Sequence, residues 1–114
     1  MSNVTPFAAP ARTPEQVAFD RLELNAILNV YGRLVSEGEW RDYAIAMDGE
    51  AAVFSAFCRA SERPEVQIVK RPALRHRQGM YALIGHGGVV LKRGHELSSV
   101  LAPLERRLLK LVDA

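Results

Sequence analysis

Hydrophobic positions early in the chain recur with the spacing of one helix face. From Leu24 to Val35 the apolar residues fall three and four positions apart, which is the period of an amphipathic helix. Asp20 stands before this run, and Glu23 follows three residues later, as a capping box requires. The pattern therefore predicts a helix over residues 20–37.

From Trp40 onward apolar and polar residues alternate, which predicts short strands. Two alternating runs flank Asp48-Gly49, a pair typical of a tight hairpin turn in which both residues take a positive φ. The links between the predicted strands are short, which favours an antiparallel meander over a βαβ unit. The predicted strands cover residues 43–47, 53–57, 65–70, 80–84 and 89–92.

The last segment returns to helix spacing. Its apolar stripe from Leu97 to Leu111 contains Pro103, and proline removes a helix hydrogen bond. We therefore expect a C-terminal helix that is interrupted near Pro103. Gly32 is a comparable misfit in the first helix, where it costs about 1 kcal/mol relative to alanine, and we expect close packing against the sheet to explain it. The predicted fold class is α+β, with an N-terminal helix, a five-stranded antiparallel β-meander and this C-terminal helix.

Length and composition indicate one domain. The chain has 114 residues, a common size for a single core. Residues 1–16 contain three prolines and no sustained apolar period, so we interpret them as a flexible tail before a single domain at 17–114. No apolar run approaches the roughly 20 residues of a membrane span, and the start lacks the pattern of a signal peptide. We expect a cytoplasmic protein without a membrane partner.

Candidate chemistry is sparse. The single cysteine, Cys58, cannot form an intramolecular disulfide and is interpreted as a buried, inert thiol. His76, His86 and His95 have no standard metal-ligand spacing, and two of them lie in basic stretches that repel a cation. The glycine-rich residues 85–88 lead into a strand, so they indicate a hairpin turn rather than a phosphate loop. With no catalytic signature, we expect no enzyme activity, metal or cofactor.

Charge is distributed unevenly along the chain. Residues 1–58 hold four basic and eight acidic residues, whereas residues 59–114 hold eleven basic and five acidic ones. The positive charge is densest around residues 70–77 and 92–95. If folding brings these two runs together, they form a surface that can hold phosphates. The candidate anion-binding residues are Lys70, Arg71, Arg75, Arg77, Lys92 and Arg93.

This charge pattern predicts a small binding module that engages nucleic acid or another polyanion. Basic residues that form a solvated rim, or that pair with the acidic segment, remain the plainer interpretation. The rival function is a protein–protein adaptor or a self-associating homo-oligomer that uses the acidic segment and the sheet face, which an open edge strand would favour. Tyr81 is the one reasonable stacking candidate near the basic residues, so a platform for single strands has little support.

Several motifs together resemble one known family. They are Phe19-Asp20-Arg21-Leu22-Glu23-Leu24, Tyr31-Gly32-Arg33, Gly38-Glu39-Trp40-Arg41-Asp42-Tyr43, Phe57-Cys58-Arg59-Ala60-Ser61-Glu62, Lys70-Arg71-Pro72 and Leu91-Lys92-Arg93-Gly94-His95. Over roughly residues 17–112 the chain is similar to a family of short, mainly alphaproteobacterial proteins that is described as a domain of unknown function. The resemblance implies a single domain in a bacterial cytoplasmic protein. It implies no activity, cofactor or site residue.

Overall fold

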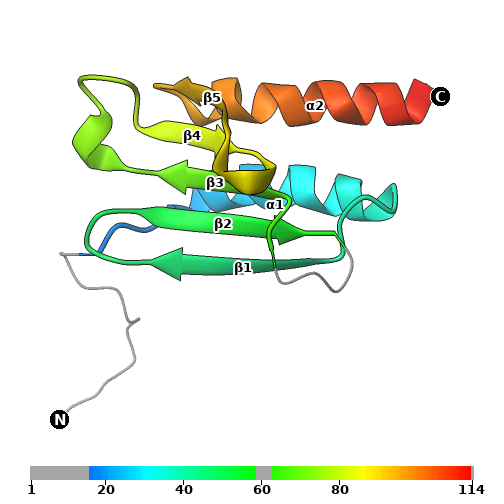
Figure 1. The fold of residues 1–114 in the computed structure, drawn as a ribbon, viewed down its shortest axis with the longest axis horizontal. Helices are drawn as coiled ribbons and strands as arrows, with labels where there is room; N and C mark the ends of the chain where they lie inside the picture. The colour runs from blue at the N-terminus through cyan, green and yellow to red at the C-terminus, as the bar shows by residue number, and fades with distance from the viewer. Residues whose placement is uncertain (1–15, 59–62, 114) are drawn as a thin grey trace, which may run out of the picture.

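A computed structural model describes residues 16–58 and 63–113, and these residues form two α-helices, two short 3-10 helices at Pro72–Leu74 and His86–Gly88, and one five-stranded sheet (Figure 1). The strand order is β1-β2-β3-β4-β5, and every neighbouring pair is antiparallel. The predicted α+β fold with its antiparallel meander is thereby confirmed. The predicted tail lies outside the described residues except for Gln16. The elements are α1 Arg21–Ser36, β1 Asp42–Met47, β2 Ala52–Phe57, β3 Val66–Lys70, β4 Tyr81–Ile84, β5 Val90–Gly94 and α2 Leu97–Asp113.

The start of α1 is the predicted capping box. The backbone N–H of Glu23 donates to Asp20 Oδ1 at 2.8 Å, and the backbone N–H of Asp20 donates to Glu23 Oε1 at 2.8 Å. These bonds satisfy two of the N–H groups that a helix start leaves unpaired. The explanation expected for Gly32 is wrong, because a Cβ atom at Gly32 would meet no atom within 4 Å.

The β1–β2 hairpin forms where Asp48-Gly49 predicts it, but with a different turn. Gly49 does not take a positive φ, so the two-residue turn expected there is wrong. Instead, Asp48 Oδ1 accepts hydrogen bonds from the N–H of Glu50 at 2.8 Å and of Ala51 at 2.9 Å. These bonds stabilise a longer loop that needs no left-handed residue. They also lower the pKa of the Asp48 carboxyl, because they favour its charged form.

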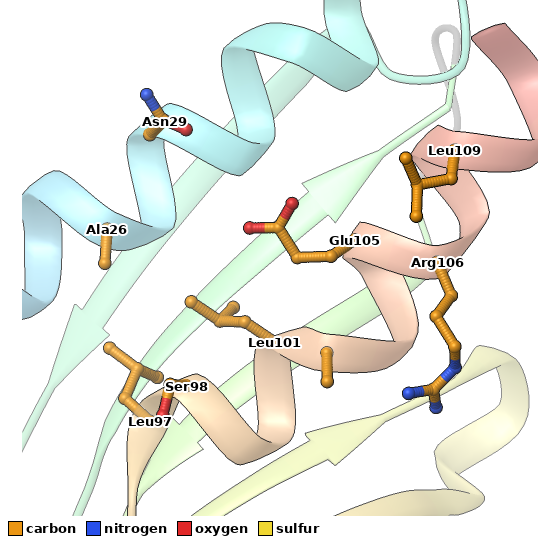
Figure 2. Close-up of a pocket in the computed structure, with 9 residues that line it drawn as sticks. Ala26, Asn29, Leu97, Ser98, Leu101, Glu105, Arg106 and Leu109 are labelled. Carbon is orange, nitrogen blue, oxygen red and sulfur yellow. The ribbon is translucent and has the colours of Figure 1, made fainter.

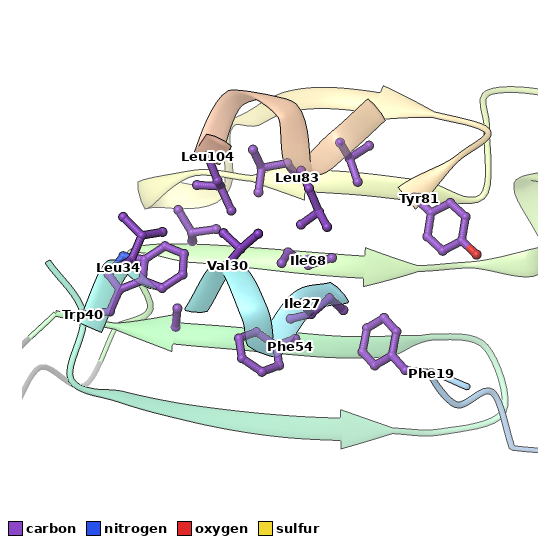
Figure 3. Packing of buried hydrophobic residues seen from close by; sticks show 14 of the residues in the cluster. Phe19, Ile27, Val30, Leu34, Trp40, Phe54, Ile68, Tyr81, Leu83 and Leu104 are labelled. Carbon is purple, nitrogen blue, oxygen red and sulfur yellow. The ribbon is translucent and has the colours of Figure 1, made fainter. Parts of the chain in front are cut away.

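Both helices pack on one face of the sheet (Figure 3). Along β2 buried and half-buried residues alternate, as expected for a strand with one covered face. The register places Phe54 opposite Ile68 and Ile68 opposite Leu83, so these three buried side chains form one row across the sheet. Helix α1 covers this row with residues such as Val30, and α2 with residues such as Leu104. The core therefore lies between one helical layer and one sheet.

Helix α2 runs from Leu97 to Asp113 through Pro103 without interruption, which differs from the interruption expected there. Proline cannot donate the N–H that would bond to the carbonyl four residues earlier. Leu101 and Leu104 lie on either side of Pro103 and are both buried in the core. Because packing of an apolar face supplies most of the stability of a helix in a protein, this contact offsets the single lost hydrogen bond.

Candidate anion-binding surface

Ion pairs in the fold join the acidic first half of the chain to its basic second half. Three basic residues of the second half are held by carboxylates of the first half, and Arg33 is held in turn by Glu105. Part of the charge polarity is therefore neutralised inside the domain. The pairs and their N···O distances are Lys70–Glu23 at 2.8 Å, Arg71–Glu50 at 3.4 Å, Arg107–Glu39 at 2.6 Å and Arg33–Glu105 at 2.8 Å.

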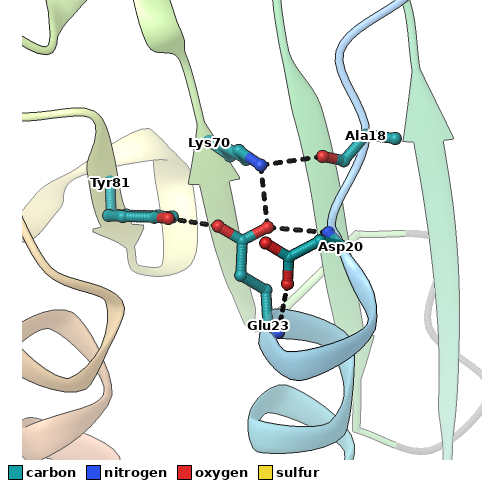
Figure 4. A network of polar contacts seen from close by, with 5 residues as sticks. All are labelled: Ala18, Asp20, Glu23, Lys70 and Tyr81. Carbon is teal, nitrogen blue, oxygen red and sulfur yellow. Dashed lines mark hydrogen bonds and ion pairs between the residues drawn. The ribbon is translucent and has the colours of Figure 1, made fainter.

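Lys70, one of the six candidate residues, is committed to a polar network at the start of α1 (Figure 4). Its Nζ donates to Glu23 Oε1 at 2.8 Å and to the carbonyl oxygen of Ala18 at 2.9 Å. The Lys70 side chain is 14% exposed. A phosphate at this position would compete with a carboxylate that is already in place, so Lys70 contributes less to an anion site than its sequence position indicates.

Tyr81 belongs to the same network and is not available for stacking. It is buried, and its hydroxyl donates to the carboxylate of Glu23. Burial, reinforced by this hydrogen bond and by the charge of Glu23, raises the pKa of Tyr81 well above its ordinary value. The one stacking candidate in the sequence therefore offers no exposed ring to a base, in agreement with the little support that the sequence gives to a stacking platform.

Arg71, Arg75 and Arg77 lie in the compact connection between β3 and β4. The N–H of Arg71 donates to the carbonyl of Met80 at 2.7 Å, which continues the ladder beyond β3. The Leu74 carbonyl then accepts from the backbone N–H groups of residues 77–79 at 3.0 to 3.2 Å. Because β3 and β5 run in the same direction, this connection and the end of β5 lie at one end of the sheet (Figure 1).

A contact between two glycines fixes this connection against β5. A Cβ atom at Gly79 would lie 2.5 Å from the backbone carbon of Gly94, and the φ of Gly79 is +102°. The close approach therefore requires glycine for both steric and conformational reasons. It holds the segment that carries Arg75 and Arg77 beside the strand that carries Arg93.

Alanine substitutions at Gly79 and Gly32 are expected to change the free energy of unfolding in opposite directions. Gly79→Ala is expected to lower the free energy of unfolding by about 2 kcal/mol, because the new methyl group meets the Gly94 backbone in a strained conformation. Gly32→Ala adds the same methyl group to open space within α1 and is expected to raise it by about 0.5–1 kcal/mol. Urea denaturation of both variants measures the difference. Equal effects of the two substitutions would contradict the assigned contact.

The sheet register places the two remaining candidates on opposite faces of β5. Arg93 lies opposite Ala82, on the face away from the helices, whereas Lys92 lies opposite the buried Leu83, on the helical side. Arg75, Arg77, Lys92 and Arg93 form no side-chain hydrogen bond or ion pair within residues 16–58 and 63–113. The structure thus brings Arg75, Arg77 and Arg93 to one end of the sheet, with Arg71 beside them, and it separates Lys92 from them.

A second group of cations on α2 lies outside the six candidates. Arg106 and Lys110 line a hollow of about 290 Å³ with Pro103 and Arg107. Burial by itself would lower the pKa of Arg107, but hydrogen bonds from its guanidinium to Glu39 and Glu65 raise it. The positive charge of Arg107 is therefore held within the fold. The common helix face of Arg106, Arg107 and Lys110 is visible in the sequence, but the carboxylates that hold Arg107 are not.

A hollow of about 520 Å³ lies between α1 and α2 (Figure 2). Its lining is mainly apolar and includes Leu97, Leu101 and Leu109. Glu105 points across it toward α1 and pairs with Arg33. No sequence signal identifies this groove, because its walls come from helices about 70 positions apart. Its surface suits apolar side chains rather than phosphates.

Other sequence candidates show no assembled chemistry. In the part of the chain that the structure describes, no group of three or more His, Cys, Asp or Glu residues is placed to hold a metal ion. Cys58 is partly exposed rather than buried. Within the same residues, no helix combines the length and apolarity needed to cross a membrane.

Comparison with known proteins identifies a family. A family model described as a protein of unknown function (DUF2794) matches residues 17–101. The chain belongs to the DUF2794 family. The DUF2794 match spans α1, the whole sheet and the beginning of α2, and so includes all six candidate residues. No curated protein and no solved structure matches the chain. The resemblance to a family of unknown function is confirmed, and the DUF2794 description names no ligand or activity.

Proposed function

We propose that this domain is a non-enzymatic binding module that engages nucleic acid or another polyanion through Arg75, Arg77 and Arg93. One observation carries this function: three exposed or half-buried arginines without side-chain partners among the described residues gather at one end of the sheet. Guanidinium groups that gather in one region attract a chain of phosphates more strongly than widely separated ones do. Each can also donate two hydrogen bonds to one phosphate.

Arg71 adds a cation that a ligand can recruit. Its guanidinium lies 3.4 Å from Glu50, whose side chain is 84% exposed. An exposed pair of this kind contributes little to stability, so a phosphate can take the place of the carboxylate at small cost. Lys70 has its own carboxylate and Lys92 points to the helical side, so both are secondary in this function.

The mode of binding follows from the side chains at this end of the sheet. The aromatic residue nearest in sequence, Tyr81, is buried and bonded to Glu23, so it offers no face for a base. Contacts to phosphates position a ligand but do not read its sequence. We therefore expect binding that depends strongly on salt and little on base sequence.

The double substitution Arg75→Glu/Arg77→Glu tests this function. It places two negative charges beside the phosphates, so we expect affinity for labelled DNA and RNA to fall by at least about tenfold at about 50 mM salt. The slope of log affinity against log salt should become shallower by about 2. Fluorescence anisotropy with the full chain across a salt series measures both quantities.

Arg106→Glu/Lys110→Glu is the matched control, because it makes the same charge change on two cations of α2 that have no ion-pair partner among the described residues. It should leave most of the affinity intact. Equal losses in both variants would mean that binding depends on net charge rather than on this end of the sheet. A larger loss in the α2 variant would move the site to the hollow on that helix, and no binding by the unmodified chain would remove the function.

A further inference from the structure

Strand β1 forms an edge of the sheet that the helices cover only in part. Tyr31 of α1 packs edge-on against the ring of Tyr43, with centroids 5.0 Å apart. All six of its residues are exposed, although their alternation is that of a strand with one buried face. The register places Tyr43, Ile45 and Met47 opposite Ala56, Phe54 and Ala52, so these side chains continue the row that forms the core. Their exposed fractions are 42%, 37% and 46%. An apolar strip therefore lies open along this edge.

The backbone of the same three residues also faces outward. The N–H of Asp48 donates to the Ala51 carbonyl at 3.0 Å, which fixes which residues of β1 turn their backbone groups toward β2. In an antiparallel ladder every second residue does so, leaving Tyr43, Ile45 and Met47 turned away. The Tyr43 N–H is satisfied locally by Asp42 Oδ1 at 2.8 Å. Within residues 16–58 and 63–113, no strand pairs with this side of β1.

The opposite edge of the sheet, β5, is protected against pairing with other chains, and β1 is not. Strand β5 contains Lys92, Arg93 and Gly94, and its register is shifted beside Leu83/Ile84. Charges and bulges of this kind keep an edge from pairing with other chains. Strand β1 is six residues long, pairs in unbroken register with β2, and contains one charged residue, Asp42, at its start. This contrast indicates an edge that is open for pairing.

Charge decides which occupant suits this edge. Asp42 and Asp48 stand at its two ends, with Glu50 in the adjoining turn. These three acids outnumber the two nearby bases, Arg41 and Arg71, of which Arg71 pairs with Glu50 at 3.4 Å. If a second copy paired antiparallel with Ile45 opposite Ile45, Asp42 of each copy would lie opposite Asp48 of the other. Like charges that face each other across a ladder are destabilising. The edge is therefore better matched by a basic strand than by itself.

We propose that β1 binds an extended peptide segment of a partner protein as a sixth strand, with apolar side chains at alternate positions and Lys or Arg between them. The apolar residues cover Tyr43, Ile45 and Met47, and the backbone of the segment pairs with their outward groups. The basic residues face Asp42 and Asp48. This interaction uses none of the arginines of the anion-binding surface and is independent of it.

The test uses the full chain and a short capped peptide that alternates valine with lysine or threonine. Anisotropy of the labelled peptide should report saturable binding, and hydrogen exchange should slow at the amides of Ile45 and Met47 when the peptide is added. Ile45→Lys is expected to weaken binding by about tenfold, because a charge then occupies the apolar strip. Val90→Lys, the matched change on the opposite edge, should alter it by less than about twofold.

Exchanging the charges of the peptide and of Asp42 distinguishes strand pairing from nonspecific binding. A peptide with glutamate in place of lysine should bind the unmodified chain more weakly and the Asp42→Lys variant more strongly. Equal effects of Ile45→Lys and Val90→Lys would overturn the proposal. It would also be overturned if the amides of Ile45 and Met47 already exchanged slowly in the chain without peptide, since another part of the chain would then occupy the edge. Protection of these amides that rises with protein concentration would assign the edge to a second copy instead.

Arg75→Glu/Arg77→Glu should leave peptide binding unchanged. Failure of peptide binding and failure of polyanion binding are therefore distinguishable.

Discussion

Glu23→Ala is expected to lower the free energy of unfolding by about 3 kcal/mol, because it leaves a largely buried ammonium group without its counter-charge. Lys70 and Glu23 side chains are 14% and 12% exposed, and their N···O distance is 2.8 Å. The same carboxylate accepts the hydroxyl of Tyr81 and the backbone N–H of Asp20. Removing it therefore breaks one of the two capping-box bonds of α1 and two cross-links to the sheet at once.

Three companion variants isolate the cause of this loss. Glu50→Ala breaks an exposed pair and should change stability by less than about 0.5 kcal/mol. Glu23→Gln keeps the cap and should cost less than Glu23→Ala, because the amide still accepts from Asp20. Glu23→Ala/Lys70→Met should recover about 1 to 2 kcal/mol, since it removes the unpaired charge as well. Urea denaturation measures all four, and a double variant no more stable than Glu23→Ala would contradict the assigned cause.

Features that depend on neighbouring residues were predictable from the sequence. The capping box needs Asp20 and Glu23 three positions apart, and the helix begins there. The alternation on either side of Asp48-Gly49 correctly placed the first hairpin. The turn itself was not predictable, because the Asp48 carboxylate competes with the glycine conformation for control of the loop.

Features that depend on long-range contact were not predictable. Nothing in the sequence pairs Lys70 with Glu23, which lies 47 positions earlier, yet that pair decides how much of the basic run remains available to a ligand. The apolar spacing of α2 continues through Pro103, but only contact with the sheet shows that packing offsets the lost bond. The contact of Gly79 with Gly94 is likewise set by strand order.

The sequence predicted the strand β1 but not its position at the edge of the sheet. Alternation of Tyr43, Ile45 and Met47 indicates a strand with one apolar face, and it forms one. Alternation does not distinguish a central strand from an edge strand, because both have period 2. The exposure that makes β1 an interaction surface follows from its place in the sheet order and from the position of the helices over β2 to β5.

Phe54→Ala is expected to lower the free energy of unfolding by about 4 kcal/mol, within the range measured when a buried phenylalanine is cut back to alanine. The Phe54 side chain is fully buried under α1, and its ring stacks on that of Tyr43 with centroids 5.0 Å apart. The cavity would open in the row of buried side chains that both helices cover. For a domain whose total stability is about 5–15 kcal/mol, this is the most severe single change that we expect.

Phe57→Ala supplies the matched control three positions along the same strand. Phe57 is half-buried on the face away from the helices, so its loss should cost about 1 kcal/mol or less. Trp40, the single tryptophan, is 1% exposed and reports unfolding by its fluorescence in both variants. If Phe54→Ala does not fold, Phe54→Leu should fold with a loss of about 1.5 kcal/mol. Equal losses at Phe54 and Phe57 would show that the second face of the sheet is covered as well, and would contradict the one-sided core.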